Sequence, residues 1–178
     1  EDLTVTGYTN VYGTLTPGAS TCYFGYGNTA SSGWDLGVRG TGILNAGTGD
    51  WYTGGVGFYS GADVTLTAGT IYISGTHSGL VWSPDQSVGS WDNNDGTVII
   101  QKTGDLRIYD ADPLTASDNQ VCPFHTLIIS GGTDRTDAPD ITLIRGLKVD
   151  NELIIKNGVL KWNTNAGSYG DVWVGAGG

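Results

Sequence analysis

The chain has 178 residues, a net charge of −10, 15% charged residues and 30 glycines. Nucleic-acid binding needs clustered Lys and Arg, and the eight basic residues are scattered, which argues against nucleic acid and against an anionic membrane surface. No run approaches the roughly 20 apolar residues of a membrane helix. Helix-forming residues are scarce while Thr, Val, Ile, Tyr and Trp are abundant, which predicts one all-β domain over residues 1–178.

The N-terminal run Glu1–Gly18 alternates β-forming and small residues, which predicts short strands. Its two charges stand at its very start, and it lacks the Lys and mid-strand Pro that protect an edge strand. We therefore expect Leu3 and Val5 to lie in an interface and to add to a neighbouring chain's sheet.

Residues 23–59 are rich in Gly and aromatic residues and show poor periodicity, which predicts an aromatic-rich cap, an edge-covering hairpin or a lateral excursion. Exposed aromatic rings can stack on the faces of sugars. Trp34, Trp51 and Tyr52 are therefore candidate ligand-binding residues, and packing inside a core or cap is the alternative interpretation.

Two Asp-rich segments are candidate metal sites. Asp92 and Asp95 flank an Asn-Asn pair in one turn, and Asp134, Asp137 and Asp140 recur at every third position of a Pro-containing loop. Ca²⁺ is bound by carboxylate, amide and carbonyl oxygens, so these residues are its candidate ligands. Solvated turns with Asx hydrogen bonds are the alternative.

Cys22 and Cys122 are the two cysteines of the chain. Their long separation and the lack of a metal-binding spacing predict a structural disulfide formed in an oxidising compartment. Two buried thiols are the alternative. The opening Glu1-Asp2 and the lack of Met predict a processed chain.

The most regular pattern spans residues 141–162, where apolar residues open blocks at 141, 147, 153 and 159. A short strand and a corner every six residues predict a β-solenoid. Ordinary hairpins, with a turn at Asn157-Gly158, are the alternative. With weaker echoes earlier in the chain, the pattern predicts a right-handed β-helix of about 20–25 residues per coil and about eight coils. A β-sandwich or jelly roll would share the composition.

Residues 3–16, with Leu-Thr-Val-Thr-Gly and Gly-Thr-Leu-Thr-Pro, and residues 124–162, with Phe-His-Thr-Leu-Ile-Ile-Ser-Gly, carry a family resemblance. They resemble the β-helix repeats of large bacterial surface adhesins and of phage or viral fibre and spike proteins. The resemblance implies a cell-surface or virion-surface location and an architectural or binding role. It brings no catalytic residue with it.

Catalytic motifs are weak in this chain. His77 lies in a predicted turn and His125 at a strand start, and no nucleophile motif accompanies them. Paired carboxylates could cleave a glycosidic bond, and Asp110 and Asp112 are candidates together with the 134–140 loop.

The C-terminal run 169–178 is as unprotected as the N-terminal one, so Val172, Trp173 and Val174 are expected in the interface. Two open edges on one subunit generate rings or filaments. The sequence thus predicts a non-enzymatic extracellular structural subunit that self-assembles into a filament, an adhesin or a virion surface structure. A carbohydrate-binding or carbohydrate-cleaving module is the alternative.

Overall fold

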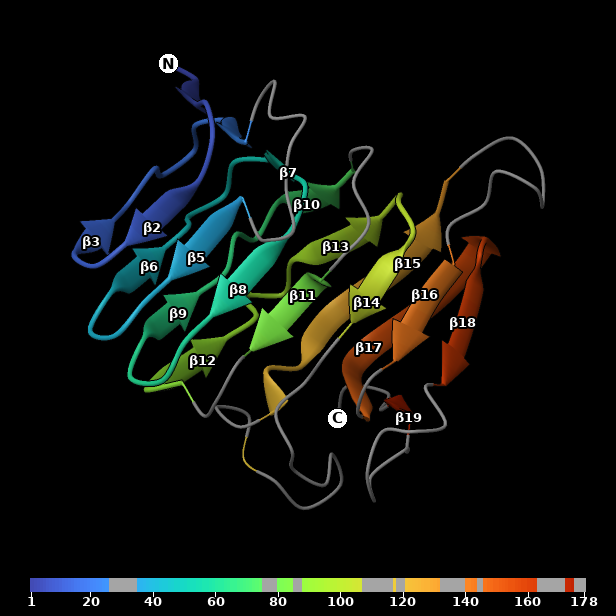
Figure 1. The fold of residues 1–178 in the computed structure, drawn as a ribbon. Coiled ribbons are helices and arrows are strands. Elements are labelled where there is room, and N and C mark those ends of the chain that lie inside the picture. The colour runs from blue at the N-terminus through green and yellow to red at the C-terminus, as the bar shows by residue number, and fades with distance from the viewer. Residues whose placement is uncertain are drawn as a thin grey trace.

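The fold is that of a computed structural model, which describes residues 1–25, 35–74, 80–84, 88–106, 117, 121–131, 140–143, 146–162 and 172–174. The regular elements of these residues are the strands β1–β19 (Figure 1). Every pair of neighbouring strands is parallel. The all-β prediction is therefore confirmed, while the alternative of a jelly roll, whose strands are antiparallel, is wrong.

The strands form three sheets. The eight-stranded sheet has the order β1 (Leu3–Val5), β4 (Cys22–Phe24), β7 (Trp51–Thr53), β10 (Thr70–Ile73), β13 (Thr97–Ile100), β15 (Phe124–Ser130), β17 (Leu147–Asn157) and β19 (Val172–Val174). The seven-stranded sheet has the order β2 (Thr9–Val11), β5 (Leu36–Val38), β8 (Val56–Phe58), β11 (Leu80–Pro84), β14 (Gly104–Leu106), β16 (Asp140–Leu143) and β18 (Val159–Trp162). The four-stranded sheet has the order β3 (Thr14–Leu15), β6 (Ile43–Asn45), β9 (Asp63–Thr65) and β12 (Ser90–Asp92).

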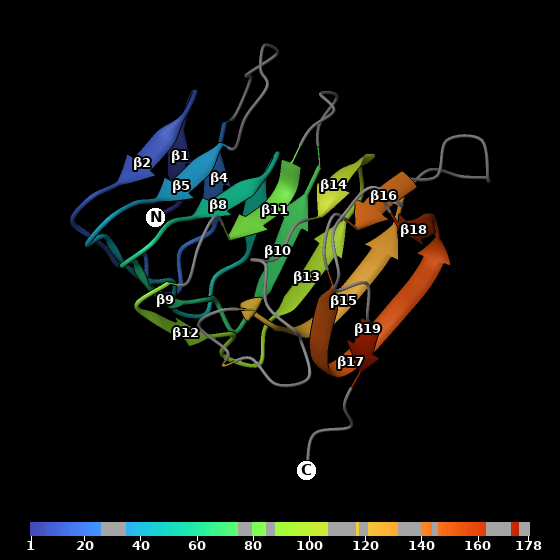
Figure 2. The same ribbon diagram turned by 60° about the horizontal axis from the view of Figure 1, so that its bottom comes forward.

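From β1 to β12 the chain visits the three sheets in turn, and from β13 to β18 it alternates between the eight-stranded and the seven-stranded sheet. Each strand of a round lies beside a strand of the previous round. We call the strands of one round a level: β1–β3 form level 1, β4–β6 level 2, β7–β9 level 3, β10–β12 level 4, β13 and β14 level 5, β15 and β16 level 6, and β17 and β18 level 7. Figure 2 shows the seven-stranded sheet adding one strand per level from β2 to β18.

Residues at equal positions of successive levels form columns. One column of the eight-stranded sheet is Leu3, Cys22, Trp51, Ile71, Val98, Leu127 and Leu153. Consecutive members lie between 19 residues (3 to 22) and 29 residues (22 to 51) apart in sequence. Because these spacings vary, no fixed sequence period marks the levels.

The core lies between the sheets and follows the alternation of each strand. In the eight-stranded sheet the column from Cys22 to Leu127 is at most 2% exposed, whereas Tyr52 and Tyr72 in the next column are half-buried. Alternation of inward and outward side chains is what a strand with one buried face requires.

An aromatic cluster fills the middle of the core. The ring centroid of Trp82 lies 5.1 Å from that of Phe58, 6.0 Å from Trp91 and 4.6 Å from Phe124. These residues come from all three sheets, and Phe58 belongs to the segment predicted as a cap. The cap prediction is wrong for the described part of residues 23–59, because β4–β8 are interior strands whose large side chains pack in the core.

Glycine is required where one level lies directly on the next. A Cβ on Gly49 would stand 2.0 Å from the carbonyl oxygen of Ser20, and one on Gly96 would stand 2.0 Å from that of Thr67. Real Cβ atoms do not approach backbone so closely, so these glycines let successive corners nest.

The six-residue blocks of residues 141–162 are only partly right. Gly158 does lie between β17 and β18, in two different sheets, so Asn157-Gly158 is a corner and not a hairpin turn. The expected corner at Asp150-Asn151 lies inside β17, where the pairing with β15 shifts between Val149 and Glu152. A bulge absorbs the polar pair without ending the strand.

The predicted disulfide is also wrong for this structure, in which Cys22 and Cys122 are buried and not bonded to each other. Cys22 opens β4, and Cys122 lies two residues before β15, four strands away in the same sheet. Four strand spacings are about 19 Å, whereas a disulfide requires Cα atoms within about 7 Å. The levels thus keep the two thiols apart.

Candidate functional site

The predicted interface residues lie at opposite edges of the eight-stranded sheet. Leu3 and Val5 belong to β1, and Val172, Trp173 and Val174 belong to β19. β19 pairs only with Leu147–Val149 of β17, so among the described residues the rest of β17 has no strand on that side. Within the described residues, each end of the structure therefore has strands with no neighbouring strand along part of one edge, β1–β3 at one end and β17–β19 at the other.

Large exposed apolar side chains gather at these two ends. In the described part of the chain they are Tyr8 (52% exposed), Tyr12 (68%), Ile155 (46%), Val159 (36%), Val172 (40%) and Val174 (46%). The two tyrosines flank β2, and the four aliphatic residues lie in β17, β18 and β19. Levels 2 to 6 contain none of these side chains within the described residues, so the exposure marks the ends.

The predicted sugar-binding aromatic residues are not arranged as a platform. Trp34 lies outside the described residues, and Trp51 is 1% exposed and packs edge-on against Phe24 in the core, so Trp51 is wrong as a stacking residue. Tyr52 stacks between Tyr23 and Tyr72, with ring centroids 5.0 and 4.8 Å apart. Because the neighbouring rings cover both of its faces, Tyr52 has no face left for a sugar.

A different polar cluster lies along the seven-stranded sheet across levels 1 to 3. The Arg39 Nε donates to Asn10 Oδ1 at 2.5 Å, and the guanidinium carbon lies 4.0 Å from the centre of the Tyr59 ring. Gly37 makes room, because a Cβ there would stand 3.0 Å from Asn10 Oδ1. No carboxylate of the described residues lies within 4.0 Å of this guanidinium. Its remaining N–H donors suit a planar anion such as a carboxylate.

The predicted metal ligands are dispersed. Asp140 pairs with Lys161 at 2.9 Å, Asp92 Oδ1 accepts the Asn94 amide at 2.8 Å, and Asp95 lies 3.1 Å from His125 Nδ1. The described residues contain no cluster of three or more metal-binding side chains. Asp134 and Asp137, like the candidate carboxylates Asp110 and Asp112 and the histidine His77, lie outside the described residues. Ca²⁺ binding therefore stays a prediction.

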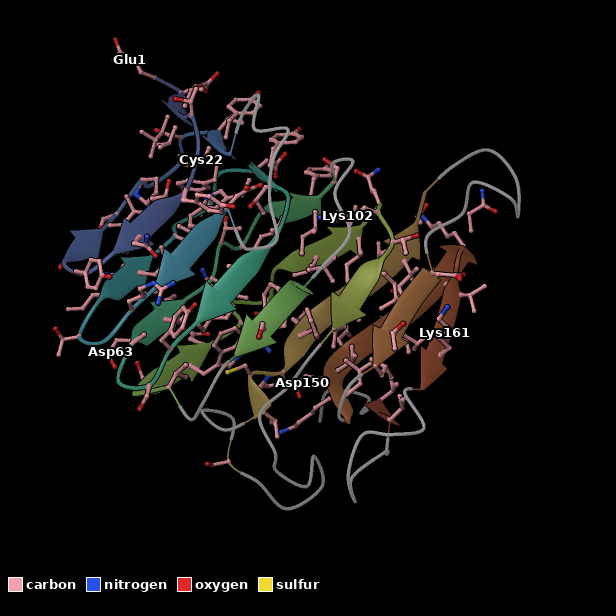
Figure 3. All side chains as sticks on the ribbon, viewed as in Figure 1. Glu1, Cys22, Asp63, Lys102, Asp150 and Lys161 are labelled. Atoms are coloured by element: carbon pink, nitrogen blue, oxygen red, sulfur yellow. The ribbon has the colours of Figure 1, made fainter. Side chains whose placement is uncertain are left out.

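Two buried charged residues, Asp35 and Lys102, bond to the same corner residue, Gly54, and not directly to each other. The Asp35 carboxylate, 2% exposed, accepts the Gly54 amide at 2.7 Å, and the Lys102 ammonium, 6% exposed, donates to the Gly54 carbonyl at 2.7 Å. Burial lowers the pKa of Lys102, and the nearby Asp35 opposes that shift. In Figure 3 Lys102 lies between Glu1 and Lys161. The pair holds the β7–β8 corner and is closed to solvent, so its role is structural.

Sequence reasoning missed the Arg39 cluster and the Asp35–Lys102 pair. Asn10 and Arg39 are 29 residues apart, and Gly54 and Lys102 are 48 apart. Such residues become neighbours only because their levels stack on one another. The unequal number of residues per level hides this stacking in the sequence. The sequence signal that could have indicated them is a charged residue close to a glycine, as in Arg39-Gly40.

Comparisons with protein-family models, with curated proteins and with solved structures found no match. Within the described residues no helix has the length and apolar character needed to cross a membrane.

Proposed function

We propose that the chain is a right-handed β-helix and that it serves as a non-enzymatic, extracellular structural subunit that assembles end to end with copies of itself. The visiting order of the three sheets supports the β-helix, since each round returns to the same sheet beside a parallel strand. Parallel strands joined by a crossover are right-handed in about 98% of cases, which supports the handedness.

One observation carries the assembly proposal: the large exposed apolar side chains gather at the first and last levels. Ile155 continues an inward column whose previous member, Ile129, is fully buried. Its exposure of 46% is explained by the lack of a described strand beside Ile155 on that side of β17. A second copy of the chain would cover this edge with strands of matching length, direction and spacing.

The setting proposed is a filament, an adhesin or a virion surface structure, on the resemblance to surface and fibre proteins. The cysteines lend no support to an extracellular location, because they are buried thiols in this structure. Support comes instead from the geometry, since end-to-end contacts between unlike surfaces generate open polymers.

The proposal predicts that Thr4→Pro prevents growth while Thr4→Ala does not. The Leu3 amide bonds inward to the Thr21 carbonyl, so by the alternation of a strand the Thr4 amide faces the open side of β1. Proline removes that donor and blocks the edge without losing an internal hydrogen bond. Alanine keeps the donor and serves as the matched control.

Mass measured by light scattering over a concentration series, with electron microscopy of the same samples, tests the proposal. We expect wild type and Thr4→Ala to lengthen with concentration and Thr4→Pro to stay monomeric, with the same circular dichroism spectrum for all three. A wild-type chain that is monomeric at millimolar concentration contradicts end-to-end assembly. So does a Thr4→Pro chain that polymerises like wild type.

A carbohydrate-binding module is the second candidate, and the Arg39 cluster favours it. The guanidinium is held by Asn10 and Tyr59, and the Arg39 amide bonds to the Val11 carbonyl, which sets Arg39 beside the exposed Tyr12. The Arg39 guanidinium can bind a carboxylate with two hydrogen bonds, and the exposed Tyr12 ring can stack on a sugar, so together they suit a sugar that bears a carboxylate. Arg39 is the one basic residue of residues 1–101, so binding would depend on this local geometry.

Titration calorimetry with oligogalacturonate and with a neutral galactose oligomer tests this candidate. We expect binding of the acidic oligomer alone, a loss of at least tenfold in affinity in Arg39→Lys, which keeps the charge and loses the fork, and no change in Lys161→Gln. Equal binding by Arg39→Lys and wild type, or no binding by wild type, contradicts it.

A further inference from the structure

The columns of the eight-stranded sheet fix how two copies would meet. Six successive levels carry Leu3, Cys22, Trp51, Ile71, Val98 and Leu127 in one column, and Leu153 follows in level 7. We infer, resting on the proposed end-to-end assembly, that β1 of the next copy continues this column and sets Leu3 on Leu153, Thr4 on Ile154 and Val5 on Ile155. This register brings Asp2 onto Glu152, a like-charged pair that limits growth.

The register is the one that keeps both faces of the sheet in place. Leu3 and Val5 are half-buried and pack against the core, as does Leu153. A shift of one residue would turn these side chains to the outer face and bring Thr4 inward. Continuing the columns therefore covers Leu153 and Ile155 with apolar side chains.

The backbone groups of the two edges match in this register. Within the chain, the Leu3 amide donates to the Thr21 carbonyl and the Cys22 amide to the Asp50 carbonyl, each bond joining a column member to the residue before the next member. By the same rule the Leu153 amide would donate to the Asp2 carbonyl of the next copy. The Thr4 amide would donate back to the Leu153 carbonyl.

The like-charged pair follows from the neighbouring column. Glu152 pairs with Thr126, which pairs with Thr97, which pairs with Thr70. The one acidic residue at this position inside the described column is Asp50, which lies between Thr21 and Thr70 and accepts the Thr70 amide at 2.9 Å, so no two carboxylates are neighbours there. Asp2 precedes Leu3 as Glu152 precedes Leu153, so the joint sets two carboxylates one strand spacing apart, about 4.8 Å. Like charges directly opposite each other destabilise a strand pair.

Among the described residues no cation lies within ion-pair distance of the Glu152 carboxylate, and Lys156 is four residues away, about 13 Å along the strand. β15 offers Thr126, which accepts the Asn151 side-chain amide at 3.3 Å. On β17 itself, Lys148 lies 3.9 Å from Asp150 and is engaged there. Salt should therefore promote growth, because ions screen the pair.

A charge-swap cycle on the 178-residue chain tests the register. Glu152→Lys and Asp2→Lys each turn repulsion into attraction, and we expect each to lower the critical concentration for polymer growth about 2- to 30-fold. The double variant Asp2→Lys with Glu152→Lys restores like charges and should return to the wild-type value. Asp63→Lys changes the net charge equally on the four-stranded sheet and should leave the value unchanged.

Salt gives a second, independent readout. Between about 10 mM and 0.5 M salt the critical concentration should fall for wild type and for the double variant, and rise for the two single variants. If polymers form and all four charge variants behave alike, the register is wrong while end-to-end assembly stands. If wild type and all variants stay monomeric at every salt concentration, the proposed assembly itself fails.

Discussion

Levels 2 to 6 and the two end levels are built from the same columns, yet they differ in how deeply their column side chains are buried. In the middle, the column residues Trp51, Ile71 and Val98 are at most 2% exposed. At the ends, Leu3 and Leu153 in the same column are only partly buried. The side chains are similar, so the difference arises from neighbours: an inner level has one on each side and an end level has one. Stability should therefore concentrate in the middle, and the proposed contact with another copy would form at the ends.

The largest effect should come from breaking the aromatic cluster in the middle. Trp82→Ala removes a fully buried indole that contacts aromatic rings from three sheets, and we expect a loss of about 3–5 kcal/mol in the free energy of unfolding. Leu153→Ala at the end should lose less than about 2 kcal/mol, because its side chain is half-buried. Urea unfolding monitored by circular dichroism measures both, and equal losses would contradict the comparison.

A similar loss should follow from breaking the buried charged pair. Lys102→Met removes the donor to the buried Gly54 carbonyl and the positive charge that acts on the buried Asp35 carboxylate, so we expect a loss of about 3 kcal/mol. Asp35→Asn in the same chain removes the carboxylate charge, so the double variant should recover part of the loss. Denaturant unfolding of the two single variants and the double variant gives the coupling energy. Additive losses would mean that the two charges do not interact.

Gly49→Ala should cost less than these two but clearly more than its control. Its Cβ would meet the Ser20 carbonyl carbon and oxygen at 2.6 and 2.0 Å, so levels 2 and 3 must move apart, and we expect a loss of about 1–3 kcal/mol. Gly13→Ala in level 1 meets nothing within 4 Å and should be neutral or slightly stabilising. Thermal melts of the two variants separate nested corners from open ones. A harmless Gly49→Ala would contradict the close approach.

Composition and alternation were enough to predict an all-β chain of short strands and to locate Leu3, Val5 and Val172 on sheet edges. They failed where the decisive neighbour is distant in sequence. Trp51 was interpreted as a ligand residue because no local pattern tells that Phe24 packs against it from the previous level. A disulfide between Cys22 and Cys122 is predicted because the number of strands between the two cysteines cannot be read from the sequence. The polar Asp150-Asn151 pair indicated a corner, and only the pairing with β15 identifies a bulge.

The cysteines should differ between the folded and unfolded chain in reactivity, with little effect on stability. Burial, and then the charge of Asp2, raise the pKa of the Cys22 thiol to about 11, so at pH 8 it is protonated as well as covered. We expect iodoacetamide to label Cys22 of the folded chain only as fast as the chain opens. Without reductant, the denatured chain should take up two alkyl groups by intact mass. A denatured chain that takes up no alkyl group would show instead that Cys22 and Cys122 are bonded.

The smallest effect should come from an exposed ion pair between levels 6 and 7, in which Lys161 is compared with the buried Lys102. Lys161 Nζ lies 2.9 Å from Asp140 Oδ2, but the two side chains are 49% and 46% exposed. Water already solvates both charges, so the pair gains little on forming and leaves no buried charge when broken. Lys161→Met should therefore change the free energy of unfolding by less than about 1 kcal/mol. The same substitution at Lys102 should change it several-fold more, because there the Gly54 carbonyl and the Asp35 carboxylate stay buried.

Parallel urea titrations of the two Lys→Met variants at 20 mM and 0.5 M salt test this comparison. We expect salt to erase the small effect at Lys161 and to leave the large one at Lys102. A loss at Lys161 as large as that at Lys102 would mean that level 7 is as well covered as the middle levels, and the distinction between ends and middle would not hold.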